Sequence, residues 1–263
     1  MMKKKKFVIC FAIVCLIVIV VGIMFYKNRK VDILYLDYGD NISNINLYKD
    51  DNEKTVLNDK DINLLFYLSD TCSPCLEELN LISQIDKLSI LDTMTINLVW
   101  QDSIPETRLK KYGFRNVNNY TLKDKVKLYV KTPYFYMVKN NKVDFCTDDQ
   151  NKIIDKLLKI VSDNDIKRSI FEELVGNTNS ELNKSCILFL SENCDSCQSV
   201  EKIFTGKKTN FLNVKVISDY ESESSIYDMY HIYSKIFGIS KYPALVTFDG
   251  NKVDCTYEFE NLH

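Results

Sequence analysis

Two short stretches of the chain repeat one pattern, in which a pair of cysteines follows an apolar run. The first stretch reads Phe66-Tyr-Leu-Ser-Asp-Thr-Cys72-Ser-Pro-Cys75, and the second reads Leu188-Phe-Leu-Ser-Glu-Asn-Cys194-Asp-Ser-Cys197. Two thiols at this spacing can exchange disulfide bonds, because one attacks a partner sulfur and the other resolves the mixed disulfide. A repeat of this length around paired thiols predicts two copies of one redox module.

Each cysteine pair is followed, further along the chain, by a proline that opens a second apolar run. These prolines stand in Thr132-Pro133 and Tyr242-Pro243, and each run leads to an Asn-Lys-Val-Asp tetrapeptide and then to Cys146 or Cys255. We expect Cys146 and Cys255 to pack as small apolar residues, with a partner disulfide or a third redox site as the alternative. Cys186 opens an apolar run and is expected to pack in a core.

The first thirty of the 263 residues differ from the rest of the chain. Four lysines precede residues 7–26, which carry no charge, and as a helix these twenty residues would span about 30 Å, the thickness of a bilayer core. No small-residue cleavage site follows, so we expect an uncleaved membrane anchor with a cytoplasmic N-terminus. A cleaved signal peptide is the alternative. Disulfide chemistry favours a location outside the cytoplasm for the remainder.

The charge balance excludes one large class of partner. Residues 1–30 hold seven of the 34 basic residues and none of the 36 acidic ones, which leaves the remainder with a net charge of −9. This is the wrong sign for a nucleic-acid-binding protein, so no nucleic acid is expected as a partner.

Periodicity and turn residues predict an α/β fold with two similar modules. We divide the chain into cytoplasmic lysines and a transmembrane helix (1–30), module 1 (31–161), a linker helix and loop (162–184) and module 2 (185–263). In module 1 the patterns predict a hairpin within 31–58, strands at 63–68, 94–100, 134–138 and 142–145, and helices at 76–88, 105–113 and 153–161. Further on they predict helices at 163–175, 195–205 and 223–237, strands at 186–191 and 211–217, and a hairpin at 244–258.

Module 2 ends with its hairpin at residue 263, whereas module 1 continues into a final helix. One face of the second sheet therefore needs a cover from elsewhere. We expect either the 163–175 helix or module 1 itself to provide it.

These residues resemble the thioredoxin-like superfamily, in which a buried strand leads into C-x-x-C at a helix start and a cis-proline precedes a later strand. Module 1 is similar to the membrane-anchored TlpA-type thiol-disulfide oxidoreductases, through Leu109-Lys-Lys-Tyr-Gly-Phe114 and Leu128-Tyr-Val-Lys-Thr-Pro133. Module 2, with Phe237-Gly-Ile-Ser-Lys-Tyr-Pro243, resembles plainer thioredoxin and disulfide-isomerase modules. The resemblance thus implies two tandem thioredoxin-like α/β/α domains.

The resemblance also implies roles for individual residues. Placed at a helix start, Cys72 and Cys194 attack, because the partial positive charge there stabilises a thiolate, and Cys75 and Cys197 resolve. The residue before each cis-proline pairs its backbone with the substrate, a role that falls to Thr132 before Pro133 and to Tyr242 before Pro243. The family's buried aspartate, six residues before the first cysteine, is replaced by Phe66 or Leu188, which puts fast reduction in doubt.

Paired cysteines can also bind zinc or form a permanent structural disulfide. Zinc sites often use two C-x-x-C pairs, but typically about 15–20 residues apart, whereas 118 residues separate Cys75 from Cys194 here. A permanent structural disulfide is the second alternative. Glu192 and Asp195 flank Cys194, and negative charge beside a thiolate favours the disulfide, so the second pair is predicted to have the lower reduction potential.

We therefore expect a membrane-anchored thiol-disulfide oxidoreductase that forms, reduces or relays disulfides in exported proteins or peptides. No metal or organic cofactor is expected, since the chain shows no phosphate-binding loop and no dinucleotide fingerprint. Electrons would then come from or go to a second, membrane-bound redox protein. The alternative from another class is an accessory protein, chaperone-like or substrate-binding, whose modules dock partners without turnover of the cysteines.

Overall fold

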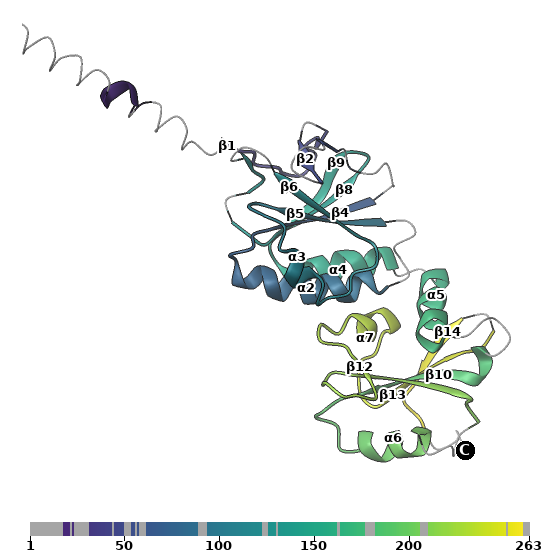
Figure 1. The fold of residues 1–263 in the computed structure, drawn as a ribbon. Helices are drawn as coiled ribbons and strands as arrows, with labels where there is room; N and C mark the ends of the chain where they lie inside the picture. Colours follow the sequence, from purple (N-terminus) through teal and green to yellow (C-terminus); the bar gives the residue numbers. More distant parts are fainter. Residues whose placement is uncertain are drawn as a thin grey trace, which may run out of the picture.

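The computed structural model describes residues 18–21, 23, 32–43, 45–49, 54–55, 57, 62–88, 94–122, 126–129, 131–161, 164–176, 182–205, 210–250 and 252–259. In this part of the chain, two mixed β-sheets with their helices form two modules (Figure 1). A short parallel pair, β1 (Asp32–Ile33) and β7 (Val126–Lys127), adds a small third sheet.

The first sheet has seven strands in the order β3-β2-β6-β5-β4-β8-β9. Strands β4, β5 and β6 are parallel, and β8 and β9 continue the sheet antiparallel beside β4. The strands are β2 (Leu47–Tyr48), β3 (Lys54–Thr55), β4 (Ile62–Leu68), β5 (Met94–Trp100), β6 (Val117–Leu122), β8 (Tyr134–Lys139) and β9 (Lys142–Thr147). The helices are α2 (Ser73–Asp86), α3 (Glu106–Leu109) and α4 (Gln150–Val161).

Strand β4 is apolar on both sides because both faces of the first sheet are covered. Leu64 and Phe66 pack on one face with α2 and α4, while Leu65 and Tyr67 pack on the other. Alternate side chains of a strand point to opposite faces, so a continuous apolar run is expected for such a strand. The second face is covered by the segment before β4, through Leu36, Ile42, Ile45, Leu47 and Leu57.

The second sheet has five strands in the order β12-β11-β10-β13-β14. Helices α5 and α7 lie on one face, with Phe171 and Ile236 buried there, and α6 lies on the other face with Phe204. The strands are β10 (Ser185–Leu190), β11 (Asn213–Ser218), β12 (Ile226–Tyr227), β13 (Ala244–Phe248) and β14 (Val253–Thr256). The helices are α5 (Asn164–Val175), the 3-10 turn η2 (Leu182–Lys184), α6 (Cys197–Thr205) and α7 (Ile232–Phe237).

The two modules are packed against each other. Helix α7 of module 2 contacts α4 of module 1, and buried apolar residues of both modules form one continuous cluster. The expectation that the 163–175 helix covers the second sheet is confirmed, since α5 contacts β10, β11 and β14. It covers the face opposite α6. On the α6 side, the outer strands present polar residues, Thr247 and Asp254, and Phe259 packs on Phe204.

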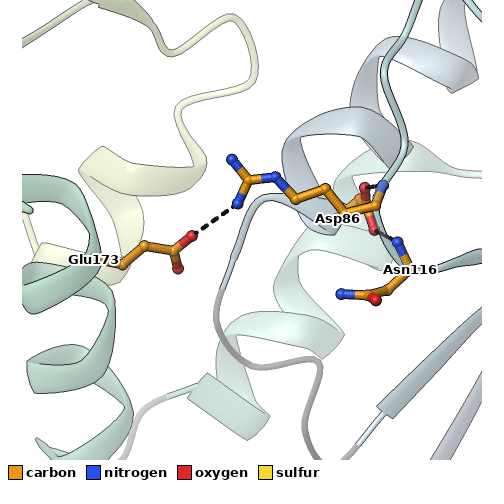
Figure 2. A network of polar contacts seen from close by, with 4 residues as sticks. Asp86, Asn116 and Glu173 are labelled. Atoms are coloured by element: carbon orange, nitrogen blue, oxygen red, sulfur yellow. Dashed lines mark hydrogen bonds and ion pairs between the residues drawn. The ribbon is translucent and has the colours of Figure 1, made fainter.

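Polar contacts join the same two modules near the end of α2. The Asp86 carboxylate is buried and accepts hydrogen bonds from the backbone N–H groups of Arg115 (2.6 Å) and Asn116 (3.0 Å). The Arg115 guanidinium then reaches Glu173 on α5 at 3.3 Å (Figure 2). Both partners of this ion pair are largely solvent-exposed, so it contributes orientation rather than much stability.

Two predicted helices are wrong in extent. The helix predicted at 105–113 is only as long as α3. The helix predicted at 223–237 is only as long as α7, because residues 226–227 form β12 and pair with β11 instead. Strand β6 was not predicted; its side chains are only half-buried for most of its length, so its apolar pattern is weak. The other predicted strands and helices of the two modules are confirmed within a few residues.

The predicted transmembrane helix, residues 7–26, lies mostly outside the described residues; of it, residues 18–21 and 23 are helical. Among the helices that the structure describes, none combines the length and the apolar character needed to cross a bilayer.

Candidate active site

The first cysteine pair lies where β4 runs into α2. Cys72 and Cys75 form a disulfide, with Cys72 as the N-cap residue of the helix and Cys75 fully buried. The backbone N–H of Cys75 donates to the Cys72 sulfur at 3.2 Å. Pro74 fits the first turn because a backbone N–H there has no partner within the helix. Cys72 is therefore the accessible sulfur, and in the reduced protein an N–H group and the helix terminus would stabilise its thiolate.

The proline loop of module 1 lies directly beside this sulfur. The peptide bond Thr132-Pro133 is cis, and the carbonyl oxygen of Thr132 lies 3.4 Å from the Cys72 sulfur. Thr132 and Pro133 are both only partly buried, so a bound chain can reach them. The structure thus brings together Cys72, Cys75, Thr132 and Pro133, which the sequence pattern had grouped across sixty residues.

Glu78 is a site residue that the sequence analysis did not single out. It is 2% exposed, and burial raises the pKa of its carboxyl group, an effect that a hydrogen bond from Gln150 (2.6 Å) partly offsets. Its other oxygen has no hydrogen-bond partner among the described residues. Glu78 follows Cys75 by three positions on α2, which places both on one side of the helix.

The surroundings of Glu78 link it to the missing aspartate of the family pattern. Glu78 lines a small hollow together with Phe66 and Pro133, and Phe66 stands where the family carries its buried aspartate. A carboxyl group is therefore present in this region, supplied by the helix rather than by the strand. The sequence does contain an indication of this site: Glu78 is an acidic residue on the same side of the helix as Leu79 and Ile82, where the apolar pattern predicts burial.

The second pair has a similar placement but a different sulfur environment. Cys194 and Cys197 form a disulfide in which Cys194 is partly exposed and Cys197 is 3% exposed. Helix α6 begins only at Cys197, and the described polar contact of the Cys194 sulfur is the Ser196 hydroxyl at 3.9 Å. The position that matches Glu78 is Val200, which is apolar and buried. This site therefore has neither the aligned N–H group nor the buried carboxyl of the first.

The proline loop of module 2 is held by a chain of hydrogen bonds. The Tyr242-Pro243 peptide bond is cis, and the Tyr242 hydroxyl lies 3.0 Å from the Ser234 hydroxyl. Ser234 in turn donates to the buried carboxylate of Asp228 at 2.8 Å, so Tyr242 is left to donate to Ser234. Asp228 also accepts backbone N–H groups at the start of α7, from Tyr233 and Ser234. Tyr242 is thereby anchored to α7, an arrangement that Thr132 cannot match.

The repeated Leu-Ser-acid motif before each cysteine pair also has a structural reason. The Ser69 hydroxyl donates to Asp102 at 2.7 Å, and the Ser191 hydroxyl donates to Asp219 at 2.6 Å. Each aspartate follows the neighbouring parallel strand, β5 or β11. In both modules, the serine thus links the loop that carries the first cysteine of the pair to the end of the adjacent strand.

The remaining described cysteines are free thiols away from these sites. Burial raises the pKa of the Cys186 thiol to about 12, and it raises the pKa values of Cys146 and Cys255 as well. Cys146 and Cys255 each lie on the sheet face opposite the helix that carries the disulfide of their module. Thiols with raised pKa values are poor nucleophiles at neutral pH, which agrees with a packing role.

Comparisons with known proteins concern about half of the chain. No family model matches the sequence, and no curated protein matches it. A thiol:disulfide interchange protein from Bacteroides sp. is 17% identical over 49% of this chain and 92% of its own, with a TM-score of 0.39. The thioredoxin domain of a thiol-disulfide oxidoreductase from Bacteroides vulgatus is 18% identical over 48% and 98%, with a TM-score of 0.39. A peroxiredoxin-like protein from Aquifex aeolicus is 14% identical over 50% and 97%, with a TM-score of 0.38.

The topology of each module carries the assignment of the fold. In both, a central strand leads into a disulfide at a helix start, the next strand lies parallel to it, and an antiparallel strand beginning after a cis-proline lies on its other side. The chain therefore consists, in its described part, of two packed modules of the thioredoxin-like fold.

Proposed function

We propose that this protein is a thiol-disulfide oxidoreductase that forms, reduces or relays disulfide bonds through its two cysteine pairs. The observation that carries the proposal is the environment of Cys72. Its sulfur is the accessible end of a disulfide, 3.2 Å from the N–H of Cys75 and 3.4 Å from the carbonyl oxygen of Thr132. A structural disulfide needs neither a thiolate-stabilising group nor a free backbone edge beside it.

The reaction at the first pair follows from this geometry. When the pair is oxidised, a substrate thiolate attacks the Cys72 sulfur, and Cys75 leaves as a thiolate. A second thiolate of the substrate then attacks the substrate sulfur of the mixed disulfide. Cys72 leaves as a thiolate that the Cys75 N–H stabilises. The substrate has gained a disulfide, and the protein has gained two electrons. The reverse sequence reduces a substrate disulfide.

Glu78 gives the buried cysteine a proton partner. The leaving Cys75 sulfur lies out of reach of solvent, so its negative charge needs a proton from within the protein. A carboxyl group whose pKa burial raises holds its proton at higher pH than an exposed one does. In the reducing direction, ionised Glu78 takes the proton from the Cys75 thiol. Module 2 has Val200 at this position, so exchange at its pair is expected to be slower.

The backbone of the proline loops would hold the substrate. A substrate chain placed beside Cys72 can pair in an extended form with Thr132, as a strand added to an edge does. Tyr242 would do the same at the second pair, since Tyr242 and Cys194 pack against the same apolar cluster. We infer that the substrates are exported proteins or peptides and that the modules lie outside the cytoplasm, tethered by residues 7–26. This rests on the sequence of the N-terminal segment and on the paired cysteines.

Trapping variants test the proposal. In Cys75→Ser, the Cys72 thiolate attacks a peptide that carries a disulfide, one peptide sulfur leaves as a thiolate, and the protein has no second thiol to resolve the mixed disulfide. A covalent adduct should therefore accumulate and be visible on a non-reducing gel. Cys72→Ser should form no such adduct at the first site, and each variant is measured with Cys194 and Cys197 both replaced by Ser. A protein that binds peptide equally well in all variants and exchanges no disulfides would instead be an accessory docking protein.

A further inference from the structure

The two cysteine pairs lie in different layers of the packed modules. Helix α2, with the first pair, lies on the side of the first sheet that faces module 2 (Figure 1). Helix α6, with the second pair, lies on the far side of the second sheet. Strand β10 shows this division, since Ile187 and Phe189 join the cluster shared with module 1 while Leu188 and Leu190 join the cluster under α6.

The layers between the pairs set a minimum separation. From α2 the order is α7, then the second sheet, then α6 (Figure 1). Packed helices lie about 8–10 Å apart and stacked layers about 10 Å apart, so the two pairs are on the order of 20–30 Å apart. A disulfide requires Cα atoms within about 7 Å of each other. Direct exchange between Cys72 and Cys194 therefore needs the modules to separate and turn.

The contacts between the modules oppose such a movement. Ile232 and Ile236 of α7 pack with buried apolar residues of α2, of the turn that follows α2, and of α4. These residues are Ile85, Leu88, Leu157 and Val161. Gln84 donates to the carbonyl oxygen of Tyr227 at 3.0 Å, and the Tyr230 hydroxyl donates to the carbonyl oxygen of Glu77 at 3.0 Å. Separating the modules would expose the apolar residues and break both bonds.

The space between the modules is not a route between the sites either. A cleft of about 700 Å³ runs along α2 on this side, lined by polar residues such as Asn80 and Gln84 and by Tyr227 and Met229 of module 2. None of its lining residues is a cysteine. This cleft therefore does not connect the two disulfides.

We propose that the two cysteine pairs of one chain do not exchange electrons directly with each other and that each serves its own external thiol–disulfide partner. The inference rests on the proposed function, because it presumes that both pairs exchange. Transfer between the pairs of one chain would need a further protein that meets both in turn. Because the second pair is predicted to have the lower reduction potential, Cys194 and Cys197 would first reduce a disulfide of that protein to a dithiol. The dithiol would then reduce the Cys72–Cys75 disulfide, and each step moves two electrons and two protons.

A variant with both resolving cysteines replaced, Cys75→Ser with Cys197→Ser, tests this directly. Only Cys72 and Cys194 then remain of the two pairs, and mild oxidation at low protein concentration should give no Cys72–Cys194 bond within a monomer, as judged by mass spectrometry of its peptides. Rapid and complete formation of that bond in the monomer would overturn the proposal. Adding Ile236→Asp, which should loosen the contact between the modules, is expected to allow the bond.

A kinetic measurement separates this proposal from the proposed function. Chains with one pair reduced and the other oxidised are prepared, and the approach to equilibrium between pairs is followed at several protein concentrations. The rate should rise in proportion to protein concentration. It should also match the rate measured when two single-pair variants are mixed, Cys72→Ser/Cys75→Ser, which keeps only the second pair, and Cys194→Ser/Cys197→Ser, which keeps only the first. A rate independent of concentration would overturn the inference. If neither single-pair variant exchanges with an added peptide, the proposed function fails instead.

Discussion

Replacing Ile236 by alanine tests whether the two modules fold as one unit. Ile236 belongs to α7 in module 2, is 4% exposed, and packs among apolar residues of module 1. The hollow there has only about 10 Å³ of open space, so the substitution creates a new cavity rather than enlarging one that water can fill. Buried Ile→Ala changes cost about 2–5 kcal/mol, and we expect about 3 kcal/mol here.

That loss is large against the total stability of such proteins, about 5–15 kcal/mol. The single tryptophan, Trp100, makes the measurement specific, since it is fully buried in module 1. Urea unfolding followed by Trp100 fluorescence reports on module 1, although the substitution is in module 2. With an m-value of about 2–3 kcal/mol/M, the midpoint should fall by about 1 M.

Met229→Ala is the matched control, because Met229 lies on the same module but is 45% exposed. Its effect should stay within about 0.5 kcal/mol. A Trp100 transition that Ile236→Ala leaves unmoved, with a separate earlier transition by circular dichroism, would refute the reasoning. The modules would then unfold independently, and their shared apolar cluster would contribute little to either.

Three further substitutions test individual groups. Glu78→Gln removes the proton partner of Cys75, so exchange at the first pair should slow by about 10²-fold. Because burial raises the pKa of Glu78, the stability it contributes is complete below its unfolded pKa, near 4.5, and is lost as the pH rises through the folded pKa. Urea unfolding from pH 4 to 8 should therefore show the Gln variant gaining stability relative to the parent as the pH rises. Asp86→Ala removes a buried carboxylate and leaves the backbone N–H groups of Arg115 and Asn116 without their partner, which should cost about 3 kcal/mol by the same unfolding assay. A loss under about 1 kcal/mol would show that water replaces the carboxylate. Tyr242→Phe removes the hydrogen bond to Ser234, which should cost about 1 kcal/mol and slow peptide exchange at the second pair only, measured with the first pair replaced by Ser. Equal slowing at both pairs would count against a local role for Tyr242.

Local patterns were sufficient for much of the fold. The apolar runs at 63–68 and 94–100 are strands within a residue of their predicted ends. A strand buried on both faces is apolar almost throughout, so its ends coincide with the ends of the apolar run. The helix ending at Gly176 was likewise readable, since a residue with φ near +69° after the last turn is typically glycine. The two cysteine pairs and the prolines after them also stood out as a repeat, whereas the cis form of the two proline bonds was expected only from the family resemblance.

The helix predicted at 223–237 shows where local patterns failed. Its first residues are as helix-compatible as its last, but residues 226–227 gain more by pairing with β11. The buried Asp228 then binds the first N–H groups of α7 and starts the helix late. Strand pairing joins segments distant in sequence, so no window of neighbouring residues contains this competition.

The paired cysteines and the elements around them could be recognised from the amino-acid sequence, because cysteine spacing, apolar runs and turn residues act over a few neighbouring positions. The surroundings of the two pairs and the distance between them depend instead on how remote segments pack. This packing buried Glu78 beside Phe66, linked Ser69 to Asp102 and Ser191 to Asp219, and set the second sheet between the two disulfides. These relations depend on which faces of distant elements pack together, and burial and charge environment follow from that packing.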